Sequence, residues 1–312
     1  MFQCCFLKRS NIGGGRNLSP ARQSLNYNRL FGYGVVFNVS YIIVEIVYGL
    51  RIDSMALLAD AGHNFGDVLS LMLAWGATSL AKTAATKNRT YGLRKSTILA
   101  SLFNAIILLI VVGAIAIESL RKIFEPQSVG GMTMTIIAGV GVVVNTLTAL
   151  LFVKGRKSDL NMKAAFLHMA ADAGISLGIV VAGLFIIMTG YVLLDPIVGL
   201  AIIIVITAGT WNLLKDSVHL SMDAVPRDID VENVKKFLTL LDGVEEVHDL
   251  HVWAMSTTET ALTAHLVMPR EHHDDKFLGN VCGQLYEKFG IEHSTIQVER
   301  NAQSASCAKD KV

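Results

Sequence analysis

The sequence carries little charge for its length. Only 17% of its 312 residues are charged and 52% are hydrophobic, whereas about 25% of the residues in a soluble domain are charged. The formal net charge is +1, and no basic stretch is rich in aromatic residues, which argues against broad nucleic-acid binding. The four cysteines form no C-x-x-C pair, so the zinc and redox motifs with that spacing are absent. This composition indicates a membrane protein with several spans and room for a small soluble domain.

Long apolar runs fill the chain from about residue 30 to about residue 214. A helix needs about 20 mostly apolar residues to cross a bilayer, and the cleanest run, residues 98–117, contains no charged residue. We predict a multi-span α-helical membrane protein with six transmembrane helices and a C-terminal α+β domain. The expected spans lie near residues 30–50, 55–80, 98–117, 132–153, 160–191 and 196–214.

Lysine and arginine are concentrated in two of the loops between these spans. The loops after the second and fourth spans carry Lys82, Lys87, Arg89, Arg94, Lys95, Lys154, Arg156, Lys157 and Lys163. Loops rich in these residues stay in the cytosol. Both basic loops and both chain termini are therefore predicted to be cytosolic.

Four segments are expected along the chain. Residues 1–28 are polar and basic and are predicted to be a disordered N-terminal tail, and residues 301–312 a disordered C-terminal tail. Residues 29–225 form the predicted membrane domain, and residues 226–300 the predicted soluble domain. The soluble domain has helix and strand patterns in the order α-β-β-α-β, which suffices for a small open sheet covered by two helices.

Two short stretches place ionisable residues inside apolar spans. His63 and Asp67 lie in the second span, and His168 and Asp172 in the fifth, each pair with the spacing His-x-x-x-Asp. Residues i and i+4 of a helix share a face, so each pair points an imidazole and a carboxylate in one direction. Asp67 lies ~18 Å from the outer start of its span and Asp172 ~18 Å from the inner start of its own. Both pairs are therefore expected near the middle of a hydrocarbon core of ~30 Å.

The charges of Asp67 and Asp172 have no cationic partner on their own helices. Residues 56–81 and 164–191 contain no Lys or Arg, so another helix, protons or a bound cation must balance these carboxylates. Two imidazoles and two carboxylates form a four-ligand set that suits tetrahedral zinc. The two stretches therefore predict a shared metal site.

Asp60 and Glu45 are further acidic residues in the first two spans. Asp60 lies three residues before His63 and therefore near the same side of the helix. It is expected either to orient that imidazole or to face outer water. Glu45 is expected to be a hydrogen-bond partner between helices.

Histidines in the soluble domain suggest a second metal site. A hairpin centred between Ser256 and Thr257 would place His248 opposite His265, with Cβ atoms about 4.5–5.5 Å apart. The alternative is that these histidines are ordinary polar residues of the strands and bind no metal. It stays open because a register slip of one residue would destroy the pairing of His248 with His265. His251 lies an odd number of residues from His248 and is expected to face the other way.

Four stretches of the chain resemble the cation diffusion facilitator family, in its zinc-transporting branch. They are LLADAGHNFGD at residues 57–67, AAFLHMAADA at 164–173, LDP at 194–196 and VHDLHVW at 247–253. The resemblance covers roughly residues 30 to 300. The stretch between Ala81 and Leu93 has no His, Asp or Glu, so the metal site that some bacterial members hold in this loop is expected to be absent.

The resemblance implies a homodimer in the lipid bilayer with metallochaperone-like (ferredoxin-like) cytosolic domains. It implies export of cytosolic Zn²⁺ in exchange for protons, with Cd²⁺ and other divalent cations as further candidates. Its intramembrane ligands fall on His63, Asp67, His168 and Asp172, whereas its cytosolic metal sites fall on His248, His265, His293 and Glu299. It also implies a charge pair near Lys95 and Asp223 that joins the membrane and soluble parts.

Short loops favour a bacterial plasma (inner) membrane, although an organellar membrane is an alternative. Two other functions are alternatives. An intramembrane zinc enzyme needs an open coordination position and a general base, whereas here four ligands fill the site and no His-Glu-x-x-His helix is present. A metal-sensing membrane protein that does not transport is the second alternative. We therefore predict a transporter rather than an enzyme.

Overall fold

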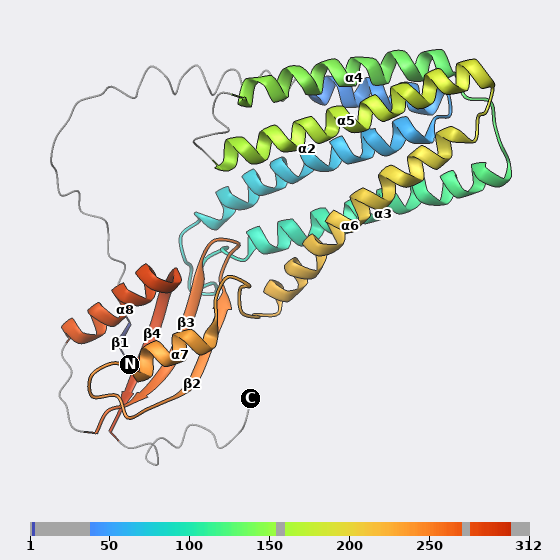
Figure 1. The fold of residues 1–312 in the computed structure, drawn as a ribbon. Coiled ribbons are helices and arrows are strands. Elements are labelled where there is room, and N and C mark those ends of the chain that lie inside the picture. The colour runs from blue at the N-terminus through green and yellow to red at the C-terminus, as the bar shows by residue number, and fades with distance from the viewer. Residues whose placement is uncertain (1, 4–37, 154–159, 270–274, 301–312) are drawn as a thin grey trace, which may run out of the picture. The chain divides into compact units, whose positions relative to one another are not determined.

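The computed structural model describes residues 2–3, 38–153, 160–269 and 275–300. Five long helices follow one another (Figure 1): α2 (Met55–Ala81), α3 (Ser96–Phe124), α4 (Gly131–Phe152), α5 (Leu160–Thr189) and α6 (Leu194–Ser221). Residues 38–51 are also helical. The chain divides into two compact units. One, the helical unit, holds residues 15–73 and 103–214, and the other holds residues 1–14, 74–102 and 215–312, which include the soluble domain.

Four of the described helices, α3 to α6, are long and apolar enough to cross a membrane. Helix α2 has 27 residues, but Asp60, His63, Asn64 and Asp67 make it more polar. Only residues 38–51 of the first expected span are described as helix. The protein is thus a helical membrane protein, while the count of six spans stays a prediction.

Two helices are longer than the predicted spans. Helix α3 ends at Phe124 rather than near residue 117, and α6 ends at Ser221 rather than near residue 214. The membrane limits the apolar part of a helix but not the helix itself. In α3 the added turns carry charges that interact along the helix, as Arg121 does with Glu118 at 3.9 Å and with Glu125 at 3.7 Å.

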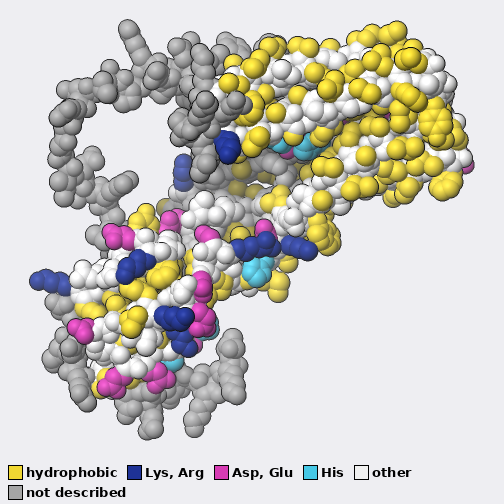
Figure 2. Space-filling model, in the orientation of Figure 1, with side chains coloured by type: hydrophobic (Ala, Val, Ile, Leu, Met, Phe, Trp, Pro, Cys, Tyr) yellow, Lys and Arg dark blue, Asp and Glu magenta, His cyan; other side chains and the backbone are white. Residues whose placement is uncertain are grey.

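The helical unit has one apolar core to which α2, α3, α4, α5 and α6 all contribute. Helices α4 and α5 lie side by side along their lengths. A side chain at Gly183 would collide with Thr135, so this glycine allows the close approach that small residues give membrane helices. Large apolar side chains, such as Met188 at 84% and Trp75 at 78% exposure, cover the outside. Figure 2 shows this apolar surface over the helices.

The start of α2 is held by the carboxylate of Asp195 in α6. Asp195 accepts hydrogen bonds from the Ser54 hydroxyl at 2.5 Å, the Met55 amide at 2.7 Å and the Ala56 amide at 3.2 Å. The first amides of a helix have no partner inside the helix, so this buried carboxylate supplies one from a distant part of the chain.

The soluble domain has the predicted order α-β-β-α-β. Its elements are α7 (Val231–Thr239), β2 (Glu246–Ala254), β3 (Thr260–Val267), α8 (Asp275–Phe289) and β4 (Ile291–Glu299). Strands β2 and β3 are antiparallel, whereas β3 and β4, joined through α8, are parallel. The Asp230 side chain caps α7 by accepting from the Glu232 and Asn233 amides.

One face of this sheet is covered by the two helices. Val234 and Leu238 of α7 and Val281 and Leu285 of α8 pack on inward side chains of the strands in one core. The other face is therefore the one on which polar strand residues lie. Phe2–Gln3 form a short strand, β1, antiparallel to β4, within the stretch that was expected to be disordered; residues 4–28 and 301–312 of the two expected tails lie outside the described residues.

Candidate functional site

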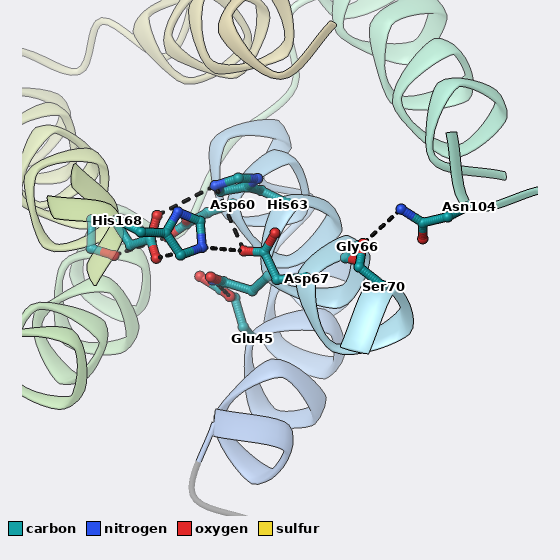
Figure 3. A network of polar contacts seen from close by, with 11 residues as sticks. Glu45, Asp60, His63, Gly66, Asp67, Ser70, Asn104 and His168 are labelled. Carbon is teal, nitrogen blue, oxygen red and sulfur yellow. Dashed lines mark hydrogen bonds and ion pairs between the residues drawn. The ribbon is translucent and has the colours of Figure 1, made fainter. Parts of the chain in front are cut away.

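The two His-x-x-x-Asp pairs meet between α2 and α5. His63, Asp67, His168 and Asp172 each offer one ligand atom, and these atoms lie within 4.8 Å of one another. Figure 3 shows the side chains of His63, Asp67 and His168 pointing toward a common point. The helical spacing read from the sequence accounts for each pair, and the packing of α2 on α5 brings the pairs together.

The separations between these atoms suit a small tetrahedral ion. His168 Nε2 lies 3.0 Å from Asp67 Oδ2 and 3.8 Å from Asp172 Oδ2. His63 Nε2 lies 3.3 Å from Asp172 Oδ1 and 3.9 Å from Asp67 Oδ2. Zinc–ligand bonds of 2.0–2.2 Å imply about 3.4 Å between neighbouring ligand atoms of a tetrahedron. Small side-chain movements would thus complete such a geometry.

Asp172 lies deepest of the four. It is 1% exposed, and neither of its carboxylate oxygens accepts a hydrogen bond from the described residues. A buried carboxylate without donors is costly unless a cation or a proton balances it. His168, in contrast, has a side chain 43% exposed, so the group is open on one side.

A network of buried polar residues lies beside this group. Glu45 accepts hydrogen bonds from the Tyr41 hydroxyl at 3.0 Å and from the side-chain amide of Asn64 at 3.4 Å. Asp60 accepts from the Ser176 hydroxyl at 3.0 Å. Glu45 and Asp60 are both 0% exposed, so Asp60 does not face water. Glu45 joins two helices, as the sequence predicted.

A second group of possible ligands lies on the open face of the soluble sheet. His248, His265 and Glu299 offer ligand atoms within 4.8 Å of one another. Glu299 lies 2.8 Å from His265 Nδ1 and 3.4 Å from His248 Nε2. Its residue exposure is only 7%, which makes a shared cation or proton favourable there.

His248 does pair with His265, but for a different reason than the predicted turn. The pairing Ala254↔Thr260 centres the hairpin on Thr257, which alone would set residue 249 opposite His265. An irregularity between His248 and His251 shifts the register by one residue and restores the pair. Because His251 then pairs with Thr263, it lies on the same face as His248, and the expectation that it faces the other way was wrong.

His293 does not join this group. It pairs with Ala261 and is six residues before Glu299, or ~20 Å along the strand. Its ring contacts Tyr91 edge-on, with 5.5 Å between the centroids. Burial, together with the charge of Arg94, lowers the pKa of His293. The structure thus brings three of the four predicted residues of the soluble domain together and leaves out His293.

Two residues with structural roles, Asp195 and Asp249 in the LDP and VHDLHVW stretches, were not predicted from the sequence. The hydrogen bonds that the Asp195 carboxylate accepts join residues 139 to 141 positions apart, and no spacing rule could have found them. Asp249 contacts the histidines of the soluble domain because its backbone is irregular, as described below.

Two family models match the chain. The cation efflux transmembrane domain matches residues 33–220, and the cytoplasmic domain of cation efflux proteins matches residues 226–301. Together these matches extend over both the helical region and the sheet.

Several curated proteins are similar to this chain over most of their length. The zinc transporter ZitB of Escherichia coli is 34% identical over 272 residues, or 86% of each chain. The cadmium, cobalt and zinc/H(+)-K(+) antiporter of Bacillus subtilis is 33% identical over 267 residues, or 84% of this chain and 86% of that protein. A solved metal-bound C-terminal domain of the CzcD transporter from Cupriavidus metallidurans is 35% identical, covers 23% of this chain and 99% of that chain, and has a TM-score of 0.22.

Proposed function

This chain belongs to the cation efflux family, also called the cation diffusion facilitators, and on that premise we propose that it exports cytosolic Zn²⁺ in exchange for protons. The transported ion would bind His63, Asp67, His168 and Asp172. The observation that carries this proposal is the convergence of four suitable ligand atoms within 4.8 Å between two membrane helices. Family membership makes the chain a transporter rather than an enzyme.

The chemistry of the proposed ligands supports exchange with protons. Zinc binds a neutral imidazole and an ionised carboxylate, so protons compete with the metal for the same atoms. A site open to the cytosol would load zinc, and a site open to the other side would release it as protons bind. Alternating access of this kind is common in secondary transporters, whose sites lie near the bilayer midplane.

The remaining expectations form part of this proposal. The protein would act as a homodimer with six spans per protomer in a bacterial plasma membrane, with both termini in the cytosol. The Zn²⁺/H⁺ exchange can be tested by reconstituting the protein in proteoliposomes and recording zinc and proton fluxes under an imposed pH gradient. Zinc flux that neither depends on the gradient nor moves protons would contradict the exchange.

His63 is expected to set the metal preference. Imidazole nitrogen suits zinc, whereas carboxylate oxygen suits manganese and magnesium better. His63→Asp should therefore lower zinc flux and raise the flux of cadmium or manganese relative to zinc, by about tenfold if one ligand contributes about 1.4 kcal/mol to the difference. Competition assays in proteoliposomes measure this ratio. An unchanged ratio would argue against His63 as a direct ligand.

The pair of Lys95 and Asp223 is expected to support transport. Lys95 Nζ lies 2.6 Å from Asp223 Oδ1, and the side chains are 47% and 56% exposed. An exposed pair contributes only about 0.2–1 kcal/mol, which allows at most about a fivefold change in rate. Lys95→Asp and Asp223→Lys should each slow transport, and the double reversal should restore part of it. If the loss of transport in the double variant equalled the sum of the two single losses, the pair would have no role in transport.

We also propose that zinc binds His248, His265 and Glu299 as a regulatory ligand. The support is the buried Glu299 carboxylate between two imidazoles. His248→Ala combined with His265→Ala should remove one zinc ion per chain in calorimetry of the full-length protein. Some transport should remain, because the membrane ligands are intact. Zinc binding like that of the parent protein would rule out this regulatory site.

A further inference from the structure

Asp249 has an unusual backbone conformation in the middle of strand β2. Its φ is 50°, and the other non-glycine residues with positive φ among the described residues are Asp53 and Asp223. The left-handed region is unfavourable for residues with a side chain, and Asp and Asn tolerate it best. Asp249 occupies the irregularity that sets His248 opposite His265. The fold therefore accepts local strain at this position.

The carboxylate of Asp249 lies between two imidazoles. Its Oδ1 is 2.9 Å from His251 Nε2, and its Oδ2 is 3.5 Å from His265 Nε2. Asp249 thus presents a carboxylate oxygen to the edge of His265.

His265 consequently has a carboxylate at each ring nitrogen. Its Nδ1 lies 2.8 Å from Glu299 Oε1, on the side of His248, and its Nε2 faces Asp249. A neutral imidazole carries one proton, and the carboxylate at one nitrogen decides which nitrogen keeps a lone pair for a metal. A proton on Nε2, directed at Asp249, leaves Nδ1 free on the side of Glu299.

We propose that Asp249 is a positioning residue of the metal site formed by His248, His265 and Glu299. It accepts the Nε2 proton of His265, so that Nδ1 of this imidazole binds the metal, and the left-handed backbone brings its carboxylate to that place. The inference rests on the regulatory zinc site proposed above. Partners of this kind, beyond the ligands themselves, typically change metal affinity 10–100-fold.

Two substitutions distinguish the effect of the Asp249 carboxylate from the effect of its backbone conformation. Asp249→Gly keeps the left-handed conformation without strain and removes the carboxylate. Asp249→Asn also tolerates that conformation and keeps one acceptor oxygen, so it should rescue part of the affinity. Glu246→Gln is a matched control, because it removes one negative charge from an exposed position on the same strand.

The experiment is zinc calorimetry on the full-length protein in detergent, with Asp172→Asn in every variant to weaken binding at the membrane site. We expect a 10–100-fold weaker affinity for Asp249→Gly, a smaller loss for Asp249→Asn and no change for Glu246→Gln. Affinity like that of the parent in Asp249→Gly would overturn the proposal. If Asp249→Gly did not fold, affinity like that of the parent in Asp249→Asn would overturn it equally.

The same measurement distinguishes this inference from the function on which it rests. A parent protein that binds no zinc at the soluble domain would remove the regulatory site, and Asp249 would lose its role with it. A parent that binds zinc there while Asp249→Gly binds equally well would leave the regulatory site intact and refute only the role of Asp249.

Discussion

Replacing Asp172 with alanine should abolish zinc transport and leave folded protein in the membrane. Asp172 is 1% exposed, and its carboxylate lies 3.3 Å from His63 Nε2 and 3.8 Å from His168 Nε2. Both imidazoles belong to the same proposed site, so we expect the rest of the fold to tolerate the loss of the carboxylate. The proposed site, in contrast, loses one of four ligands and half of its negative charge. Loss of a partner beyond the ligands already costs 10–100-fold in affinity, so we expect flux to fall by more than about 100-fold.

Zinc uptake into proteoliposomes measures this effect, and size-exclusion chromatography in detergent confirms that the variant is folded. Asp67→Ala should behave in the same way, because it removes the matching carboxylate of α2. Glu125→Gln, at a side chain 70% exposed, is the control and should transport normally. Normal flux in a folded Asp172→Ala protein would contradict the assignment of the membrane site.

Replacing Asp195 with alanine should cause a large loss of stability. The substitution would leave the Ser54 hydroxyl and the amides of Met55 and Ala56 without their acceptor, in a place where Asp195 is 0% exposed. A buried donor without a partner costs about 1–3 kcal/mol, so the total loss should be at least about 3 kcal/mol. The start of α2, the helix that carries His63, would be the first part to loosen.

Thermal unfolding of the purified protein in detergent should show this loss as a clearly lower midpoint. Asp195→Asn keeps one acceptor oxygen and should fall between the parent and the alanine variant. Asp228→Ala, at an exposed residue before α7, should leave the midpoint unchanged. An Asp195→Ala protein as stable as the parent would show that water replaces the lost acceptor.

The features that follow from local spacing could be predicted from the sequence. The positions of His63 and Asp67 four residues apart fix their common direction as soon as α2 is helical, and the same holds for His168 and Asp172 in α5. The order of helices and strands in the soluble domain also follows from local patterns of apolar residues. The ligand role of these residues remains a prediction, which the variants above test.

Features that depend on distant contacts could not be predicted in this way. The contact of Asp195 with the start of α2 arises only when separate helices pack. The role of Glu45 between helices was predicted, but its partner Asn64 was not. The pairing of His248 with His265 was predicted from a turn centred one half-residue away from the actual one. The register shift at Asp249 nevertheless restores the predicted pair. Nothing in the local sequence requires Asp249 to adopt the left-handed conformation that accompanies this shift.

The division of the membrane site between two helices has a consequence for how an ion could be released. Each helix supplies an imidazole and a carboxylate one turn apart, so each would act as a bidentate chelator of the proposed ion. A slide of α5 along α2 by one helical turn, ~5.4 Å, would separate the two chelators without changing either. Zinc would then be held by two ligands instead of four. The second pair would no longer lie close enough to bind the same ion, so its high effective concentration at the ion would be lost. A movement along the helix axes would in this way become a change in affinity.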